Sequence, residues 1–404
     1  MGRHSNGAGV SKTRLLLLFG IFLIAMNLRA PFTGVAPLLD VLKATFSLST
    51  AQSGLLITLP LLAFSFISPF AALFASRWGL ERSLLGALLV IAAGILLRSV
   101  GSTTALYVGT AIIGAGIAVG NVLLPSVLKR DFPSRVAALT AGYVLIMGCT
   151  AALVSAIAVP LAGLGGGSWH LALAATVVLP VLAAVAWLPQ VSRRRESSTS
   201  IAKAMRRAPI WRSAIAWQVT IFLGLDCFLY YVGVSWLPAI LHDAQFSQEQ
   251  AGSMHGVLLL STALPGLVLI PLAPRMKDQR NAACLLALSI MVGLLGLHFV
   301  PKLAVLWILF FGFGAGGGLI LALTFLSLRT ADATDAASLS GMSQSLGYLL
   351  AATGPAMIGF FRDVSGGWGA PLLVCAGFSI VMAVVGLMAG RNIQISVDRG
   401  SATA

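Results

Sequence analysis

The feature that most constrains this chain is a succession of twelve apolar runs, each long enough to cross the hydrocarbon core of a bilayer as a helix. Hydrophobic residues make up 58% of the 404 residues and charged residues only 9%, so most of the chain cannot face water. The runs lack the alternation of barrel strands, and in lipid only a helix then satisfies the backbone. We therefore predict an all-α membrane protein whose twelve transmembrane helices cover residues 14–40, 51–76, 81–100, 104–128, 134–162, 169–188, 212–241, 248–274, 280–299, 302–328, 335–361 and 370–390.

The basic residues behind the formal net charge of +14 are scattered at the ends of these runs. That placement is typical of a topology signal, and it makes nucleic acid an unexpected partner. Most Lys and Arg residues fall on the side that would hold the N-terminus, the central loop and the C-terminus. The positive-inside rule therefore predicts that both termini are cytoplasmic, and an even number of spans agrees with this.

An internal repeat predicts the domain organisation. Phe46-Ser47 recurs as Phe246-Ser247, and Gly114-Ala115-Gly116 recurs as Gly314-Ala315-Gly316, both with a shift of 200 residues. Six spans per half, beginning on the same side, make this a parallel repeat, which places a binding site at the interface between the halves. The predicted domains are a cytoplasmic tail at 1–13, an N-terminal six-helix bundle at 14–188, a basic cytoplasmic linker at 189–211, a C-terminal six-helix bundle at 212–390 and a cytoplasmic tail at 391–404.

Three sequence motifs carry a family resemblance. They read NLRAPFTGVAPLL from residue 27, GNVLLPSVLKRDFP from residue 120 and SGMSQSLGYLLAATGP from residue 340. With the 6+6 plan, they resemble the major facilitator superfamily over the whole chain, and within it the bacterial cyanate-permease branch. The resemblance implies a transporter in the bacterial inner membrane, with a cyanate-like or 2-nitroimidazole-like solute. We also expect a monomer.

Two ionisable residues lie in the middle of predicted spans, where charge is costly and therefore a sign of function. Arg29 and Asp226 fall in the first helix of each half, so they can face each other across the central interface. A guanidinium presents a planar fork of donors that suits a carboxylate, a nitro group or a small linear anion. We predict that Arg29 binds the electron-rich group of the solute, with Asp226 as its counter-ion or as a proton site. The alternative is a structural ion pair between the two helices.

Other polar residues extend this candidate site. Ser340, Gln344 and Tyr348 share one helix face, which favours a binding surface, whereas a lone polar residue more often bonds to a neighbouring helix. His255 has a side chain suited to carrying protons, and a structural bond to a neighbouring helix is equally compatible with its position. The predicted substrate-binding residues are Asn27, Arg29, Thr33, Asn121, Tyr143, Gln218, Asp226, Tyr230, His255, Gln344 and Tyr348, with Asp226 and His255 as coupling residues.

The sequence contains no Walker loop, and Gly314-x-Gly316 lies within an apolar run with no strand before it. Transport would therefore run on a solute or proton gradient, by a rocker-switch form of alternating access. No metal or hydrolase spacing of His, Asp and Glu supports an enzyme, and no cofactor is expected. The four cysteines (Cys149, Cys227, Cys284 and Cys375) fall inside apolar runs and are interpreted as packing residues. The alternative function is proton-coupled multidrug efflux.

Overall fold

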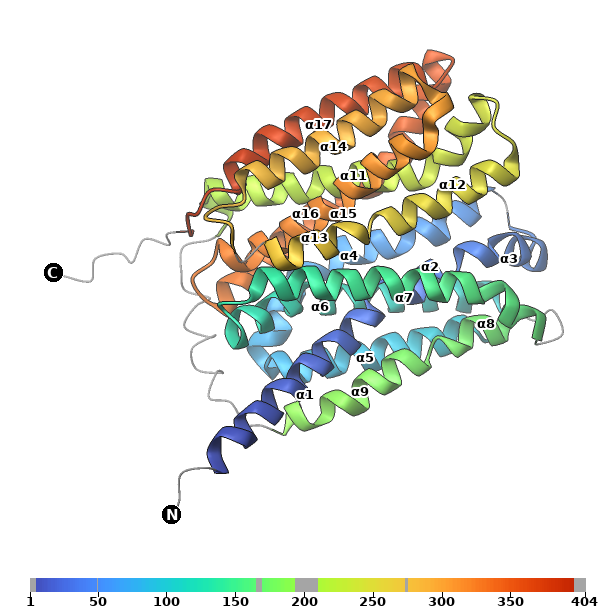
Figure 1. Ribbon diagram of the computed structural model, residues 1–404. Helices are drawn as coiled ribbons and strands as arrows, with labels where there is room; N and C mark the ends of the chain where they lie inside the picture. The colour runs from blue at the N-terminus through green and yellow to red at the C-terminus, as the bar shows by residue number, and fades with distance from the viewer. Residues whose placement is uncertain (1–4, 49, 165–168, 193–209, 273–274, 396–404) are drawn as a thin grey trace.

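The described part of the computed structural model comprises residues 5–48, 50–164, 169–192, 210–272 and 275–395, and its regular structure is helical throughout. The helices lie side by side in one bundle, with the two halves of the chain on opposite sides (Figure 1). Helix α1 begins and α17 ends at the same end of this bundle, which we call the terminal face. Residues 193–209 of the basic linker predicted at 189–211 lie outside the described residues, and its first residues belong to the last helix of the N-terminal half, which ends at Val191.

The N-terminal half contains six membrane-crossing paths. Its elements are α1 (Ser5–Asn27), α2 (Ala30–Thr33), the 3-10 helix η1 (Ala36–Leu38), α3 (Leu39–Phe46), α4 (Thr50–Trp78), α5 (Leu80–Arg98), α6 (Thr103–Asp131), α7 (Val136–Leu164), α8 (Trp169–Ala175) and α9 (Val178–Val191). The first helix starts at Ser5, earlier than the apolar run at residue 14 predicts.

The C-terminal half repeats this plan. Its elements are η2 (Ile210–Arg212), α11 (Ala214–Asp243), α12 (Gln248–Ser261), α13 (Leu264–Leu272), α14 (Arg280–Phe299), η4 (Pro301–Leu303), α15 (Ala304–Leu328), α16 (Ala333–Ser365) and α17 (Gly369–Ala389).

Eleven of the described helices or helix pairs are long and apolar enough to cross a membrane, and α16 accounts for the twelfth span. With 33 residues it is the longest of these helices, and it packs against α11 and α4. It falls short on hydropathy because its N-terminal half contains the serine-rich sequence SLSGMSQS. The predicted set of twelve helices is therefore retained, with one helix held among the others by polar contacts.

Proline explains the three interrupted spans. Proline has no N–H and its ring crowds the carbonyl four residues earlier, so the helix loses a backbone hydrogen bond at that point. The path through α1 breaks after Asn27, four residues before Pro31, and α12 ends at Ser261, four residues before Pro265. Similarly α8 ends at Ala175, next to the position four residues before Pro180. By contrast, α4, α6 and α11 remain continuous through their internal prolines.

Glycines at matching contacts confirm the internal repeat and correct its register. A Cβ added to Gly116 of α6 would press on Ala87 O and Ile91 of α5, and one added to Gly314 of α15 would press on Leu286 O and Ile290 of α14. The equivalent of Gly314 is therefore Gly116, 198 residues earlier, whereas the sequence match paired it with Gly114. The letters GAG repeat in both halves, but the close approach of two backbones decides which glycine is equivalent.

Candidate functional site

A cavity lies at the interface of the two halves. Its lining residues come from the break in the first span, from α4, α6, α7, α11, α15 and α16, and from the break between α12 and α13. They are Leu28, Arg29, Phe32, Phe64, Asn121, Met147, Asp226, Cys227, Tyr230, Tyr231, Thr262, Ala315, Gly316, Leu319 and Tyr348. Five of the eleven residues in the predicted site thus meet here: Arg29, Asn121, Asp226, Tyr230 and Tyr348.

Arg29 links the two halves within this cavity. The break after Asn27 leaves Arg29 at the N-cap of α2 with φ −138° and ψ −42°, outside regular helix geometry. Its Nη2 donates a hydrogen bond to the hydroxyl of Tyr230 on α11. The guanidinium carbon also lies 4.8 Å from the centre of the Tyr230 ring, a cation–π contact. The charge is therefore held by one aromatic residue, and the guanidinium retains further donors for a solute.

Aromatic rings from both halves line the same cavity. Phe64 of α4 meets Tyr348 of α16 edge to face, with 4.8 Å between ring centres. Tyr230 and Tyr231 meet in the same way, with 5.1 Å between ring centres. Such walls offer flat apolar surfaces with hydroxyl groups at their rims, which suits a planar solute with polar substituents.

Asp226 lines the same cavity but is almost wholly buried, with 1% of its surface exposed. Its Oδ1 has no hydrogen-bond partner and faces Gly318 of α15, where an added Cβ would collide with it. Among the described residues, no carboxylate lies within 4 Å of the Arg29 guanidinium. The direct ion pair between Arg29 and Asp226 that we considered from the sequence is therefore not formed in this state, although one cavity holds both groups.

Three predicted residues of the N-terminal half do not line the cavity. Asn27 is fully buried and its Nδ2 donates to Leu23 O at 2.8 Å, one turn earlier in α1. The hydroxyl of Thr33 donates to backbone carbonyls of Arg29 and Ala30, so it stabilises the short helix α2. Tyr143 of α7 is 1% exposed and belongs to the apolar core.

Three predicted residues of the C-terminal half also lie elsewhere. Gln218 accepts a hydrogen bond of 3.2 Å from Arg391, just beyond α17, and does not line the cavity. One ring nitrogen of His255 lies 3.0 Å from Val234 O of α11, which is the helix-to-helix alternative. Gln344 donates to Ser340 at 2.8 Å within α16.

Several lining residues were not predicted as site residues. Tyr231 and Cys227 flank the predicted Tyr230 and Asp226, and Thr262 and Gly316 lie at the break between α12 and α13. A signal existed for the last pair, because Pro265 predicts a bend and a glycine in α15 permits the close approach of Thr262 O. Cys227 was interpreted as a packing residue, yet it is both buried and part of the lining.

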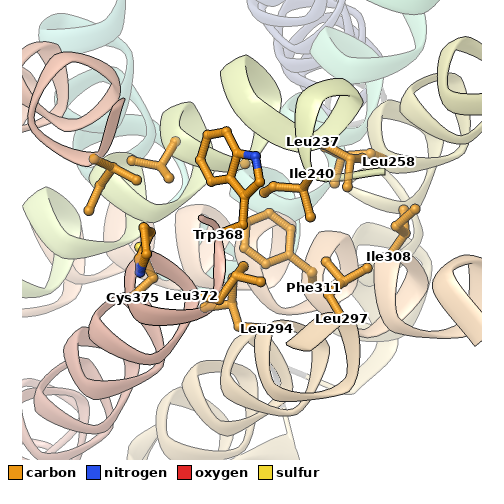
Figure 2. Close-up of a pocket in the computed structure, with 14 residues that line it drawn as sticks. Leu237, Ile240, Leu258, Leu294, Leu297, Ile308, Phe311, Trp368, Leu372 and Cys375 are labelled. Atoms are coloured by element: carbon orange, nitrogen blue, oxygen red, sulfur yellow. The ribbon is translucent and has the colours of Figure 1, made fainter. Parts of the chain in front are cut away.

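A second pocket lies within the C-terminal half, away from this interface (Figure 2). Leu, Ile, Val and aromatic side chains line it, including Phe311 and Trp368. No charged residue lines it, so it offers a polar solute nothing to bind. The interface cavity, with Arg29 and Asp226, is the candidate functional site.

Comparisons with known proteins show the family of this chain. The family described as "Major Facilitator Superfamily" matches residues 17–352. A 2-nitroimidazole transporter of Escherichia coli (strain K12) is 52% identical over 95% of this chain and 98% of its own length. The cyanate transport protein CynX of the same organism is 29% identical over 92% of this chain and 95% of its own length. These relatives confirm the resemblance to the cyanate-permease branch.

Solved structures show the same fold. The proton:xylose symporter XylE superposes with a TM-score of 0.77, covering 93% of this chain and 95% of that structure, at 12% sequence identity. With the spanning helices, the two related halves and the matching family, the chain is a multi-pass membrane transporter, and it belongs to the major facilitator superfamily.

Proposed function

We propose that this transporter moves a small planar solute of the 2-nitroimidazole type, which Arg29 binds through its electron-rich group. The observation that carries the proposal is the guanidinium of Arg29, which projects into an interface cavity and is held there by Tyr230 of the other half. A nitro group or a ring nitrogen accepts hydrogen bonds from such a fork. The relative named as a 2-nitroimidazole transporter supports this class of solute.

Cyanate is the smaller solute that the branch suggests, and the relative named for cyanate transport keeps it a candidate. The aromatic walls favour the planar heteroaromatic ring, because the Phe64–Tyr348 and Tyr230–Tyr231 pairs offer ring faces and edges that a linear triatomic anion does not fill. Proton-driven efflux of bulky cations is disfavoured, since the cavity contains a guanidinium that repels them.

Asp226 is our proposed coupling group. It is buried against Gly318, has an unpartnered oxygen and still forms part of the cavity wall. A carboxyl group in that position is stable when protonated and costly when ionised. A proton taken up with the solute would therefore change the balance between the inward-facing and outward-facing states of the transporter. His255 does not line the cavity, and a coupling role for it stays a prediction.

The contacts between the halves support an alternating-access cycle. Ser327 of α15 donates to Pro125 O of α6 at 2.9 Å, and Ser345 of α16 donates to Ser65 O of α4 at 2.7 Å. In each helix these residues lie closer to the terminal face than the nearest cavity residue does. With both termini cytoplasmic, as the basic residues predict, this state is closed toward the cytoplasm, and opening requires these bonds to separate.

The test is uptake into proteoliposomes that contain the purified transporter. Radiolabelled 2-nitroimidazole and cyanate are offered separately, with and without an imposed pH gradient. We expect saturable uptake of 2-nitroimidazole that is lost in Arg29→Ala, in protein that still reaches the membrane. The matched control is Arg362→Ala, because Arg362 is exposed and pairs with Asp243 and Asp363 outside the cavity. Normal uptake by Arg29→Ala, or proton-driven flux of bulky cations, would contradict the proposal.

A further inference from the structure

Arg98 is a fully buried arginine that the proposed solute site does not include. It is the last residue of α5, none of its surface is exposed and it is not a lining residue of the cavity. A Cβ at Gly109 of α6 would collide with the backbone of Arg98, so α5 and α6 approach each other closely at this residue. A buried charge within a membrane protein is expensive and requires a physical reason.

The guanidinium of Arg98 donates to the break in the first span. Its Nη1 lies 2.7 Å from Pro31 O, two residues after Arg29. In a regular helix this carbonyl would accept a bond from the N–H of residue 35, but the N–H of Val35 donates instead to Phe32 O. The break therefore leaves the Pro31 carbonyl without its backbone donor, and Arg98 supplies one from another helix. A buried carbonyl left unpaired would be costly.

The other two nitrogens of the Arg98 guanidinium make no hydrogen bond within the described structure. Its Nε and Nη2 are buried and have no hydrogen-bond partner among the described residues, and no described carboxylate lies within 4 Å of it. A hydrogen bond that only joins two helices does not need a charged guanidinium with three nitrogens, since a neutral donor could bond to the same carbonyl. The charge adds strength to the single bond at Pro31 O, because charge-assisted hydrogen bonds are about twice as strong as neutral ones.

Contacts from three neighbouring helices hold the broken segment of the first span in place. Leu28, just before Arg29, fits against Gly120 of α6, and Gly34, just after α2, lies against Val154 of α7. Arg98 holds the middle of this segment through Pro31. These three contacts fix both flanks and the centre of the segment that carries Arg29. One of the three comes from a residue of α5 that does not line the cavity.

We propose that Arg98 is a positioning residue for solute recognition, which holds the broken turn of the first span so that Arg29 points into the cavity. The inference rests on the proposed function, because it assigns Arg98 an effect that passes through Arg29. A purely structural role would lower the amount of folded transporter without changing the affinity for solute. A positioning role changes KM, and it does so only while Arg29 is present to be positioned.

The experiment is a double-mutant cycle on the full-length transporter in proteoliposomes, with 2-nitroimidazole as the solute. Arg29→Lys, Arg98→Met and the double variant are compared by KM and by maximal rate per folded transporter. We expect Arg98→Met to raise KM about tenfold, as for a lost hydrogen bond to a charged group, with Arg98→Lys restoring part of the affinity. In the Arg29→Lys background, Arg98→Met should change KM by no more than about twofold, the scatter of independent sites.

The matched control is Arg329→Met. Arg329 is also a buried arginine that donates to backbone carbonyls, at 2.8 Å to Ala389 O and 3.1 Å to Gly390 O, but these lie at the end of α17. We expect this variant to lower the yield of folded protein and to leave KM unchanged.

The possible outcomes separate the two proposals. Equal increases in KM for Arg98→Met in both backgrounds, or no change in either, would overturn the positioning role alone. If Arg98→Met, Arg98→Lys and Arg98→Gln all fail to fold, Arg98 is structural and the inference is wrong. A wild-type KM in Arg29→Lys would overturn the proposed function and the positioning role together.

Discussion

Asp226 occupies in the C-terminal half the position that Leu28 fills in the N-terminal half. The Leu28 side chain lies where a Cβ on Gly120 would be, and the Asp226 carboxylate lies where a Cβ on Gly318 would be. Both pairs are separated by 198 residues, the register that the other glycine contacts establish. A carboxyl group thus stands in a packing site that the repeat fills with leucine. The matching contact in the N-terminal half is apolar, and burying a carboxyl group there costs free energy that a leucine does not.

This equivalence predicts the behaviour of Asp226→Leu. Because the matching socket already accepts leucine, the variant should fold at least as stably as the wild type, with a thermal midpoint that does not fall. We expect it to lose pH-gradient-driven accumulation of 2-nitroimidazole while it still exchanges solute across the membrane. Gradient-driven uptake and counterflow in the same proteoliposomes measure the two activities separately.

The control for this prediction is Asp243→Asn. Asp243 is partly exposed and lies 3.7 Å from Arg362 at the end of α11, so it should keep both activities. Full gradient-driven accumulation by Asp226→Leu would show that another group couples transport to protons.

Gly318→Ala should be among the most damaging glycine substitutions. The added methyl group would collide with the Asp226 side chain and lie 3.0 Å from the Met382 side chain, so both buried side chains must shift or their helices must move apart. Overpacking of this kind destabilises by about 1–3 kcal/mol. Gly256→Ala in α12 is the matched control, because nothing lies within 4 Å of its added Cβ. The thermal midpoint of each variant is measured by size-exclusion chromatography after heating to a series of temperatures. Equal midpoints for the two variants would contradict the packing argument.

Tyr230→Phe removes the hydroxyl that accepts from Arg29 and keeps the ring beneath the guanidinium. Hydrogen bonds to charged groups contribute about 1.5–3 kcal/mol, so a partial loss of orientation should raise KM several-fold. Tyr230→Leu removes both contacts and should raise KM further. Initial rates of 2-nitroimidazole uptake at a series of concentrations measure both values. A KM for Tyr230→Leu below that of Tyr230→Phe would mean that the ring contributes nothing.

A disulfide between Ser65→Cys and Ser345→Cys should stop transport reversibly. The two helices are joined there by a bond of 2.7 Å from the Ser345 hydroxyl to Ser65 O, and the proposed cycle requires them to separate. In a background without the four native cysteines, oxidation should abolish uptake and a reducing agent should restore it. Each single-cysteine variant serves as the control. Undiminished uptake by the cross-linked protein would show that this contact persists throughout the cycle.

Much of the fold could be predicted from the sequence because lipid allows few alternatives. Long apolar runs must be helices, and prolines mark the three interrupted spans. The parallel repeat was also predictable, although its register was two residues wrong between Gly114 and Gly116. Which glycine faces which helix depends on how the backbones approach each other, and the letters alone do not contain that information.

The candidate site was only partly predictable. Arg29 and Asp226 stood out because charge is rare in membrane helices, and both line the cavity. Gln218 was misplaced, since it lies about two turns nearer the terminal face than Asp226, where Arg391 binds it. Tyr231 and Phe64 were missed because an aromatic residue in an apolar helix gives no sign of whether it faces lipid, core or cavity.

The low hydropathy of α16 has a consequence for how the protein is made. A segment rich in serine partitions poorly into lipid by itself, so its integration depends on helices that already reside there. Ser343 of α16 forms a hydrogen bond of 2.9 Å with Thr220 of α11, and Ser345 of α16 donates one to Ser65 O of α4. The helix α16 thus has one such partner in each half of the chain. The eleventh span therefore takes polar partners from both halves of the chain, and we expect its integration to follow that of α4 and α11.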